Sequence, residues 1–69
     1  MIDQNRLNAQ IQASGYKKKY LARALGISSA TLYSRLRGQS EFRLGEAQRL
    51  GFLLGLSEEE QARCFWTLK

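Results

Sequence analysis

Residues 20–38 of the chain read YLARALGISSATLYSRLRG. In this stretch Leu21 and Leu25 lie four residues apart, and so do Leu32 and Leu36, which is the spacing of apolar residues along one face of a helix. A glycine stands between the two patterns, where a tight turn needs a residue that tolerates a positive φ. The stretch therefore predicts two short helices joined by a tight turn.

The residues of the turn divide its tasks among them. Gly26 provides the positive φ, Ile27 packs into the core, and Ser28 caps the helix that follows. Ala22 is expected to face that helix, because a larger side chain would hold the two helices apart. Two helices joined in this way form a helix-turn-helix, whose second helix enters the major groove of DNA. We expect this recognition helix at about residues 29–37.

The rest of the chain predicts three more helices and no strands. Strand-type alternation of apolar and polar residues is nowhere sustained, and the chain contains no proline. Asp3 is a suitable N-cap, and Ser57 with Glu60 forms a capping box at the start of the last helix. The expected helices span residues 4–14, 18–25, 29–37, 44–54 and 58 to 65 or 66, in one all-α domain of residues 1–69.

Other positions carry expectations about packing. Phe42 is expected to anchor the loop after the recognition helix, and Tyr16 to fold back into the core. Gly51 stands inside the fourth helix, where it costs about 1 kcal/mol relative to alanine, so another helix is expected to pass close by. The residues of the fourth helix that are expected to face inward are Leu44, Ala47, Leu50, Leu53 and Leu54.

Positive charge is concentrated around the predicted helix pair. The chain carries a net charge of +5, and residues 17–43 alone hold seven basic residues against Glu41, a net charge of +6. Clustered basic charge indicates a polyanionic partner such as nucleic acid. The charge alone is equally consistent with a solvated face that keeps the protein soluble.

Several kinds of site are missing from the sequence. Cys64 is the only cysteine and histidine is absent, so an internal disulfide and a zinc site are excluded, and we expect no cofactor or metal. A buried thiol is expected at Cys64, with a reactive thiol as the alternative. The acidic residues 58–60 are explained as a helix start, so we expect no enzyme activity and no small-molecule substrate. With no membrane-length apolar run and no signal-peptide pattern, the expected location is the cytoplasm, without a membrane partner.

The helix pair is similar to a known family. The motif from Leu21 to Leu32, which includes Ala22, Gly26 and Ser28, resembles the helix-turn-helix of the lambdoid phage repressor and Cro superfamily, also called the XRE type. The resemblance implies a compact five-helix, lambda-repressor-like bundle in which the second and third helices form the helix-turn-helix.

Two further features place the resemblance closest to small Cro-like regulators of phages and prophages of Gram-positive bacteria. They are the segment LRGQSEF at residues 36–42 and the aromatic pair at residues 65–66, so the resemblance covers roughly residues 4–66. It implies a protein of the bacterial cytosol or nucleoid, of phage or prophage origin. The chain departs from the family at Lys17 and Lys18, where Thr or Ser followed by Gln is common, and at Arg35, where an apolar residue is usual.

The resemblance also implies which residues contact DNA. The residues that would read bases are Ser29, Ala30, Tyr33 and Ser34. The residues that would contact phosphates are Lys17, Lys18, Lys19, Ser28, Arg35, Arg37, Gln39 and Arg43. For Arg35 a guanine contact is the alternative, and Tyr20 and Arg23 stay open between a DNA contact and ordinary packing or solvation.

One such domain reads about half an operator, so the resemblance implies a homodimer, at least on DNA. The C-terminal residues Phe65, Trp66 and Leu68 are the expected dimer surface, with Phe52 and Leu56 nearby. Closure of the protein's own core explains these residues equally well.

The preferred hypothesis is a Cro-like or repressor-like transcriptional regulator that binds double-stranded operator DNA. The main alternative is a protein-interaction module of the same fold, such as an antitoxin or an antirepressor-type partner. A non-specific architectural DNA-binding protein is a further alternative.

Overall fold

The computed structural model of the protein describes residues 2–66. This part of the chain forms five helices and no strands: α1 (Gln4–Ser14), α2 (Lys18–Leu25), α3 (Ser29–Leu36), α4 (Leu44–Leu53) and α5 (Glu58–Phe65). The all-helical prediction is confirmed, and the predicted helix bounds hold to within one residue at each end. The recognition helix predicted for residues 29–37 ends one residue earlier, because Gly38 adopts a positive φ of 76° and terminates it.

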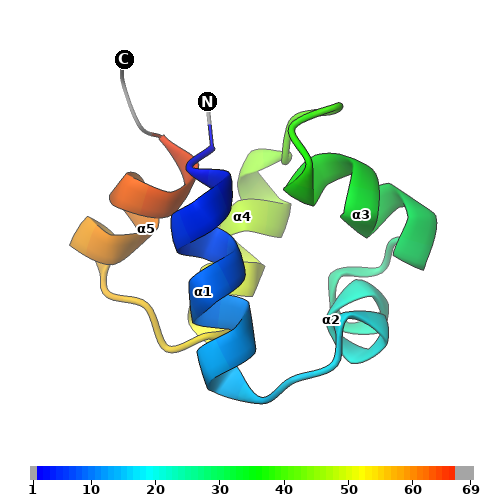
Figure 1. Cartoon of the computed structure of the whole chain (residues 1–69), viewed down its shortest axis with the longest axis horizontal. Coiled ribbons are helices and arrows are strands. Elements are labelled where there is room, and N and C mark those ends of the chain that lie inside the picture. Colours follow the sequence, from blue (N-terminus) through cyan, green and yellow to red (C-terminus); the bar gives the residue numbers. More distant parts are fainter. Residues whose placement is uncertain (1, 67–69) are drawn as a thin grey trace.

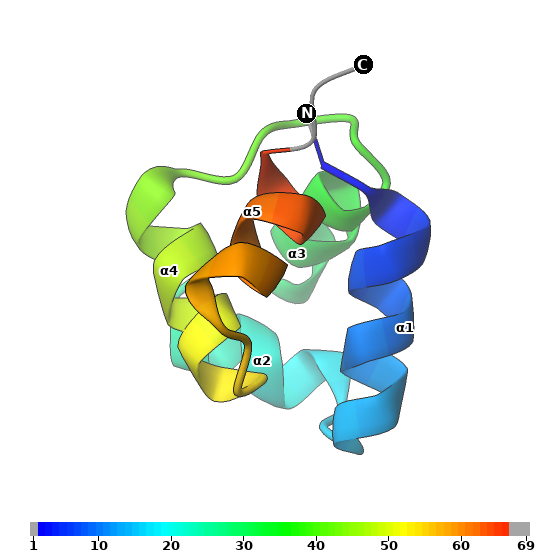
Figure 2. The same cartoon turned by 90° about the vertical axis from the view of Figure 1, so that its left-hand side faces the viewer.

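The helices pack as a small bundle (Figures 1 and 2). Helix α1 packs against α5 and α3, while α4 packs against α5 and α2. Helices α2 and α3 pack against each other more extensively than any other pair and lie together at one side of the molecule. The opposite side is formed by α5, with α1 passing between them in the view of Figure 1.

Every helix contributes to a single core. Phe42, in the loop between α3 and α4, is buried and contacts Phe65 edge-to-face with the ring centroids 5.3 Å apart, as expected of an anchor for that loop. Cys64 is fully buried, and burial raises the pKa of its thiol, which agrees with a packing role and not with a reactive thiol. The buried core residues are Leu7, Ile11, Leu21, Ala22, Leu32, Leu36, Phe42, Ala47, Leu50, Leu56, Cys64 and Phe65.

Two packing predictions were wrong. Leu44 is 61% exposed at the first position of α4, whereas Ala47, one turn later, is buried. Tyr16 is 42% exposed and does not enter the core; its ring stacks on that of Tyr20 at a centroid distance of 5.2 Å. Leu53 and Leu54 are half-buried and pack at the edge of the core.

A largely buried ion pair ties α3 to α4. The Nε atom of Arg35 lies 2.8 Å from Oε1 of Glu46, and both side chains are nearly covered. A second guanidinium nitrogen of Arg35 donates to the Ser40 hydroxyl and to the carbonyl of Glu41. The carboxylate of Glu46 also accepts the backbone N–H of Arg43 at the start of α4. The pair therefore holds the end of α3, the following loop and the first turn of α4 together.

The prediction for Gly51 is confirmed. A Cβ atom at this position would lie 2.5 Å from Cδ of Gln61 on α5, so a larger residue would require the Gln61 side chain to move. In its place Gln61 donates through Nε2 to the carbonyl of Leu56. Gly45, in the same helix, has open space at its Cβ position.

Replacing Glu46 with glutamine should destabilise the protein by about 2–4 kcal/mol, because Arg35 would keep a nearly buried charge without a counter-charge. Glutamine can still accept the N–H of Arg43, so the measured loss of stability reflects the ion pair and not the cap of α4. The matched control is Glu59→Gln, which breaks the exposed pair with Arg63 and should change stability by less than about 1 kcal/mol. Urea unfolding measures both; equal small losses would contradict the structural role of the pair.

The two glycines of α4 should respond oppositely to alanine. Gly45→Ala should stabilise the protein by up to about 1 kcal/mol, since a helical glycine is replaced in open space. Gly51→Ala should show no such gain or a net loss, because the new methyl group displaces Gln61 and its hydrogen bond. Thermal unfolding of both variants measures the difference, and an equal gain at the two sites would refute the close approach of α5.

Candidate nucleic-acid interface

The turn between α2 and α3 has the conformation that its sequence predicts. Gly26 has a φ of 72°, and its N–H donates to the carbonyls of Ala22 and Arg23. The N–H of Ile27 donates to the carbonyl of Ala22, and the Ile27 side chain packs against the core. Ser28 then caps α3 by accepting the N–H of Thr31 at 3.0 Å. The turn thus fixes the direction in which α3 leaves α2.

Three of the four residues expected to read bases lie exposed on α3. Ser29 and Ala30 occupy its first turn and Tyr33 its second, where the tyrosine ring is 43% exposed. The fourth, Ser34, is half-buried, and its hydroxyl lies 3.1 Å from that of Ser40 in the following loop. The structure therefore leaves Ser29, Ala30 and Tyr33 accessible together and engages Ser34 within the protein.

Arg35 does not lie where a DNA contact requires it. Its side chain is nearly covered, and its guanidinium is bound by Glu46, Ser40 and the backbone of Glu41. The expectation of a phosphate or guanine contact is thus corrected: Arg35 is a structural residue of the bundle. The charge of Arg35 is accommodated at this nearly covered position because Glu46, eleven residues later, supplies its counter-charge.

The lysines at the start of α2 lie beside the exposed face of α3. The ammonium of Lys18 lies over the ring of Tyr33, 5.3 Å from its centroid, a cation–π contact between the two helices. Lys17 and Lys19 are exposed on either side of it in the chain. The N-terminal end of α2 thus places one cation over the exposed tyrosine of α3 and two more exposed cations next to it in the chain.

The other expected phosphate contacts differ in how free they are. Arg37, Gln39 and Arg43 are exposed beyond the end of α3. The Ser28 hydroxyl is occupied, because it accepts the N–H of Thr31 and donates to the Thr31 hydroxyl. A phosphate contact from Ser28 would have to replace one of these bonds.

The N-terminus of α2 lacks a side-chain cap. Asp3, Ser28 and Ser57 cap α1, α3 and α5, whereas Lys17 stands at the cap position of α2 and accepts no N–H through its side chain. The side chain of residue 17 therefore does not satisfy the first-turn N–H groups of α2, at an end of the helix where the helix dipole favours an anion.

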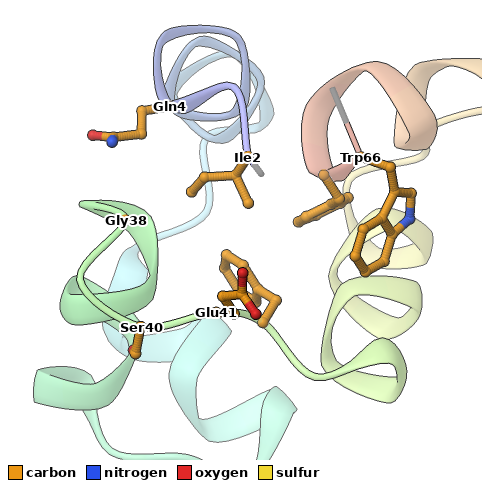
Figure 3. A pocket seen from close by; sticks show the side chains of 8 residues that line it. Ile2, Gln4, Gly38, Ser40, Glu41 and Trp66 are labelled. Atoms are coloured by element: carbon orange, nitrogen blue, oxygen red, sulfur yellow. The ribbon is translucent and has the colours of Figure 1, made fainter. Parts of the chain in front are cut away.

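The expected dimer surface is changed by the structure. Phe65 is 1% exposed and belongs to the core, as does Leu56, so neither supplies an interface. Trp66 is 47% exposed and lies at the rim of a cavity of about 240 Å³, where the Ile2 side chain also points (Figure 3). Leu68 lies outside the described residues. Phe52 is 82% exposed, the most exposed large apolar side chain of residues 2–66.

Sequence reasoning left one group of residues undecided. Tyr20 and Arg23 line a surface hollow of about 230 Å³ together with Lys17 and Lys19. The spacing of Lys19 and Arg23, four residues apart in α2, was a signal that they share a face. The stacking of the Tyr16 ring on Tyr20 was not predicted, because Tyr16 was expected to enter the core.

Other kinds of site find no support in the described part of the chain. Residues 2–66 contain no group of three or more His, Cys, Asp or Glu side chains that could hold a metal ion. None of the five helices is long and apolar enough to cross a membrane.

The description of the exposed face formed by α2 and α3 rests on the geometry and charge of this chain alone. No protein-family model matches the chain, and no curated protein or solved structure matches it either.

Proposed function

We propose that the protein is a sequence-specific DNA-binding regulator in which α2 and α3 act as a helix-turn-helix. The observation that carries the proposal is the accessible face of Ser29, Ala30 and Tyr33, bordered by cations on both sides. Lys18 lies beside it on α2, and Arg37 and Arg43 follow it in the loop that leads to α4. A helix in the major groove needs this combination of short or aromatic readers and flanking phosphate contacts.

The proposed division of labour follows from the chemistry of each side chain. The Ser29 hydroxyl can donate to or accept from a base edge, and Ala30 and the Tyr33 ring offer apolar contacts for a thymine methyl group. Lys18 would neutralise a phosphate while its contact with Tyr33 keeps it next to the base-reading face. The uncapped N–H groups of α2 support a second interaction with the same backbone.

Two copies of the chain would bind one operator. A single module contacts about half a site, and two-fold dimers of such modules bind half-sites about 34 Å apart. With Phe65 in the core, Trp66 remains as the proposed contact between copies. A dimer that forms on DNA would appear as a two-fold symmetric binding site.

The second candidate is a protein-interaction module of the same fold. The observation that favours it is the exposed ring of Phe52, an apolar side chain on α4 outside the region that the DNA proposal uses. Retention of a protein partner by the wild type but not by Phe52→Ser, with no duplex binding at physiological salt, would favour this function over DNA regulation.

The combined substitution of Ser29 and Tyr33 by alanine should abolish sequence preference. Wild type and variant are compared by their affinities for the duplex that the wild type prefers and for a shuffled duplex of equal length. The variant should bind both alike, since the lost contacts are those to base edges. Gln12→Ala on the exposed side of α1 is the control and should retain the preference. An unchanged preference in the double variant would refute the assignment of the base-reading residues.

Lys18→Ala should weaken binding to all duplexes by the same factor. The slope of log K against log salt should become shallower by about 0.9, the value for one phosphate contact. Arg63→Gln removes one positive charge from α5 and serves as the matched control, with an expected slope equal to that of the wild type. A loss confined to the preferred duplex would instead make Lys18 a base-reading residue.

A further inference from the structure

Within residues 2–66 the basic side chains fall into two groups. One group is engaged inside the protein: Arg6 with Asp3, Arg35 with Glu46, Arg63 with Glu59, Arg49 with the carbonyl of Ala24, and Lys18 with Tyr33. The other group makes no ion pair, side-chain hydrogen bond or ring contact there, and consists of Lys17, Lys19, Arg23, Arg37 and Arg43. Three of these five, Lys17, Lys19 and Arg23, lie at the N-cap of α2 or within it.

Those three cations surround the hollow on α2. Lys17, Lys19 and Arg23 line it with Tyr20, and no acidic side chain takes part in its lining. Three positive charges around about 230 Å³ of solvent repel one another, and none of the three forms an ion pair within the described residues. An anion in the hollow would offset the repulsion.

The tyrosine gives the hollow a fixed wall. Tyr20 is stacked on Tyr16 with an angle of 24° between the rings, which restricts the ring without covering it. Its phenolic hydroxyl is a donor as well as an acceptor. Lysine, arginine and a phenol together supply the donors that a phosphate oxygen accepts.

We propose that this hollow, formed by Lys17, Lys19, Tyr20 and Arg23, binds a phosphodiester of DNA that flanks the bases read by α3. The inference rests on the proposed function and extends it. It assigns to Tyr20 and Arg23 a role in binding, and it places part of the affinity outside the segment of DNA whose sequence is read.

Two observations favour a DNA backbone over an acidic protein segment as the occupant. Lys17 lines the hollow at the N-terminal end of α2, and the next residue, Lys18, lies over the ring of Tyr33, so the hollow begins at the end of α2 that meets the proposed base-reading face. A duplex carries a negative charge about every 3.4 Å along each strand, so phosphates continue past the α2 N-terminus. In addition, three of the four residues that line the hollow are cations, which suits the regularly spaced charges of a phosphate backbone.

The first experiment tests for the anion site with inorganic phosphate. Amide NMR spectra of the full chain are recorded with sodium phosphate and with sodium chloride at equal ionic strength. We expect phosphate-specific shifts at residues 16–24 in the wild type and their loss in Lys19→Gln/Arg23→Gln. Phosphate shifts that persist unchanged in the double variant would overturn the assignment of the hollow.

The second experiment asks whether the anion is DNA. Affinity for the duplex that the wild type prefers is measured between 50 and 200 mM salt. Over this range the wild type should lose about tenfold more affinity than the double variant, the difference expected for two phosphate contacts. The preference over a shuffled duplex should stay unchanged. Arg6→Gln/Arg63→Gln is the control of equal charge, placed on α1 and α5.

The outcomes separate this inference from the proposed function. If the wild type binds a preferred duplex and both double variants lose affinity equally, the hollow makes no specific phosphate contact and the inference fails alone. If the wild type binds no duplex, the proposed function fails and the assignment to DNA fails with it. Shifts of residues 16–24 with polyglutamate, but not with phosphate or duplex, would assign the hollow to an acidic protein and overturn the inference.

Discussion

The junction between α3, the loop after it and α4 depends on the ion pair between Arg35 and Glu46. Arg35 is the penultimate residue of α3, and Glu46 lies in the first turn of α4. The intervening loop is bound to the same guanidinium through Ser40 and the carbonyl of Glu41. A domain of 69 residues has a small core and a small margin of stability, so the loss of one partner of this nearly buried pair is expected to be costly.

The same pair determines which charges remain available. Glu46 neutralises the one arginine of α3, and the acidic residues of α5 lie on a helix that packs against α1 and α4 and makes no extensive contact with α2. As a result, α2 and the loop after α3 present cations without acidic partners on both sides of the exposed face of α3. Stability and the proposed DNA contacts thus use separate sets of basic residues, and substitutions should affect one property without the other.

The helices were predictable because the residues that begin and end each helix lie next to it in the sequence. Asp3, Ser28 and Ser57 cap three helices as expected, and Gly15, Gly26 and Gly38 adopt the positive φ that terminates the helices before them. Such signals involve residues that lie within a few positions of one another, so periodicity and cap chemistry recover them.

Two outcomes that the sequence did not decide depend on contacts between segments that lie apart in the chain. The partner of Arg35 lies eleven residues away in another helix, and Phe65 packs in the core against Phe42 from the loop after α3. Tyr16 stacks on Tyr20 outside the core, a choice that hydrophobicity alone does not reveal. For the candidate site, the base-reading and phosphate-contacting residues were proposed from local pattern and resemblance. The tertiary structure was needed to show that Arg35 is engaged by Glu46 and that Arg23 lines one hollow with Lys17 and Lys19.

The central claim is that α3 reads a specific DNA sequence, and selection of bound duplexes from a random pool tests it most directly. The wild-type chain should enrich one short motif, repeated with two-fold symmetry at a separation of about one helical turn. Enrichment should be absent for the variant that lacks the Ser29 and Tyr33 side chains. A pool that stays random after repeated rounds with the wild type would contradict the account.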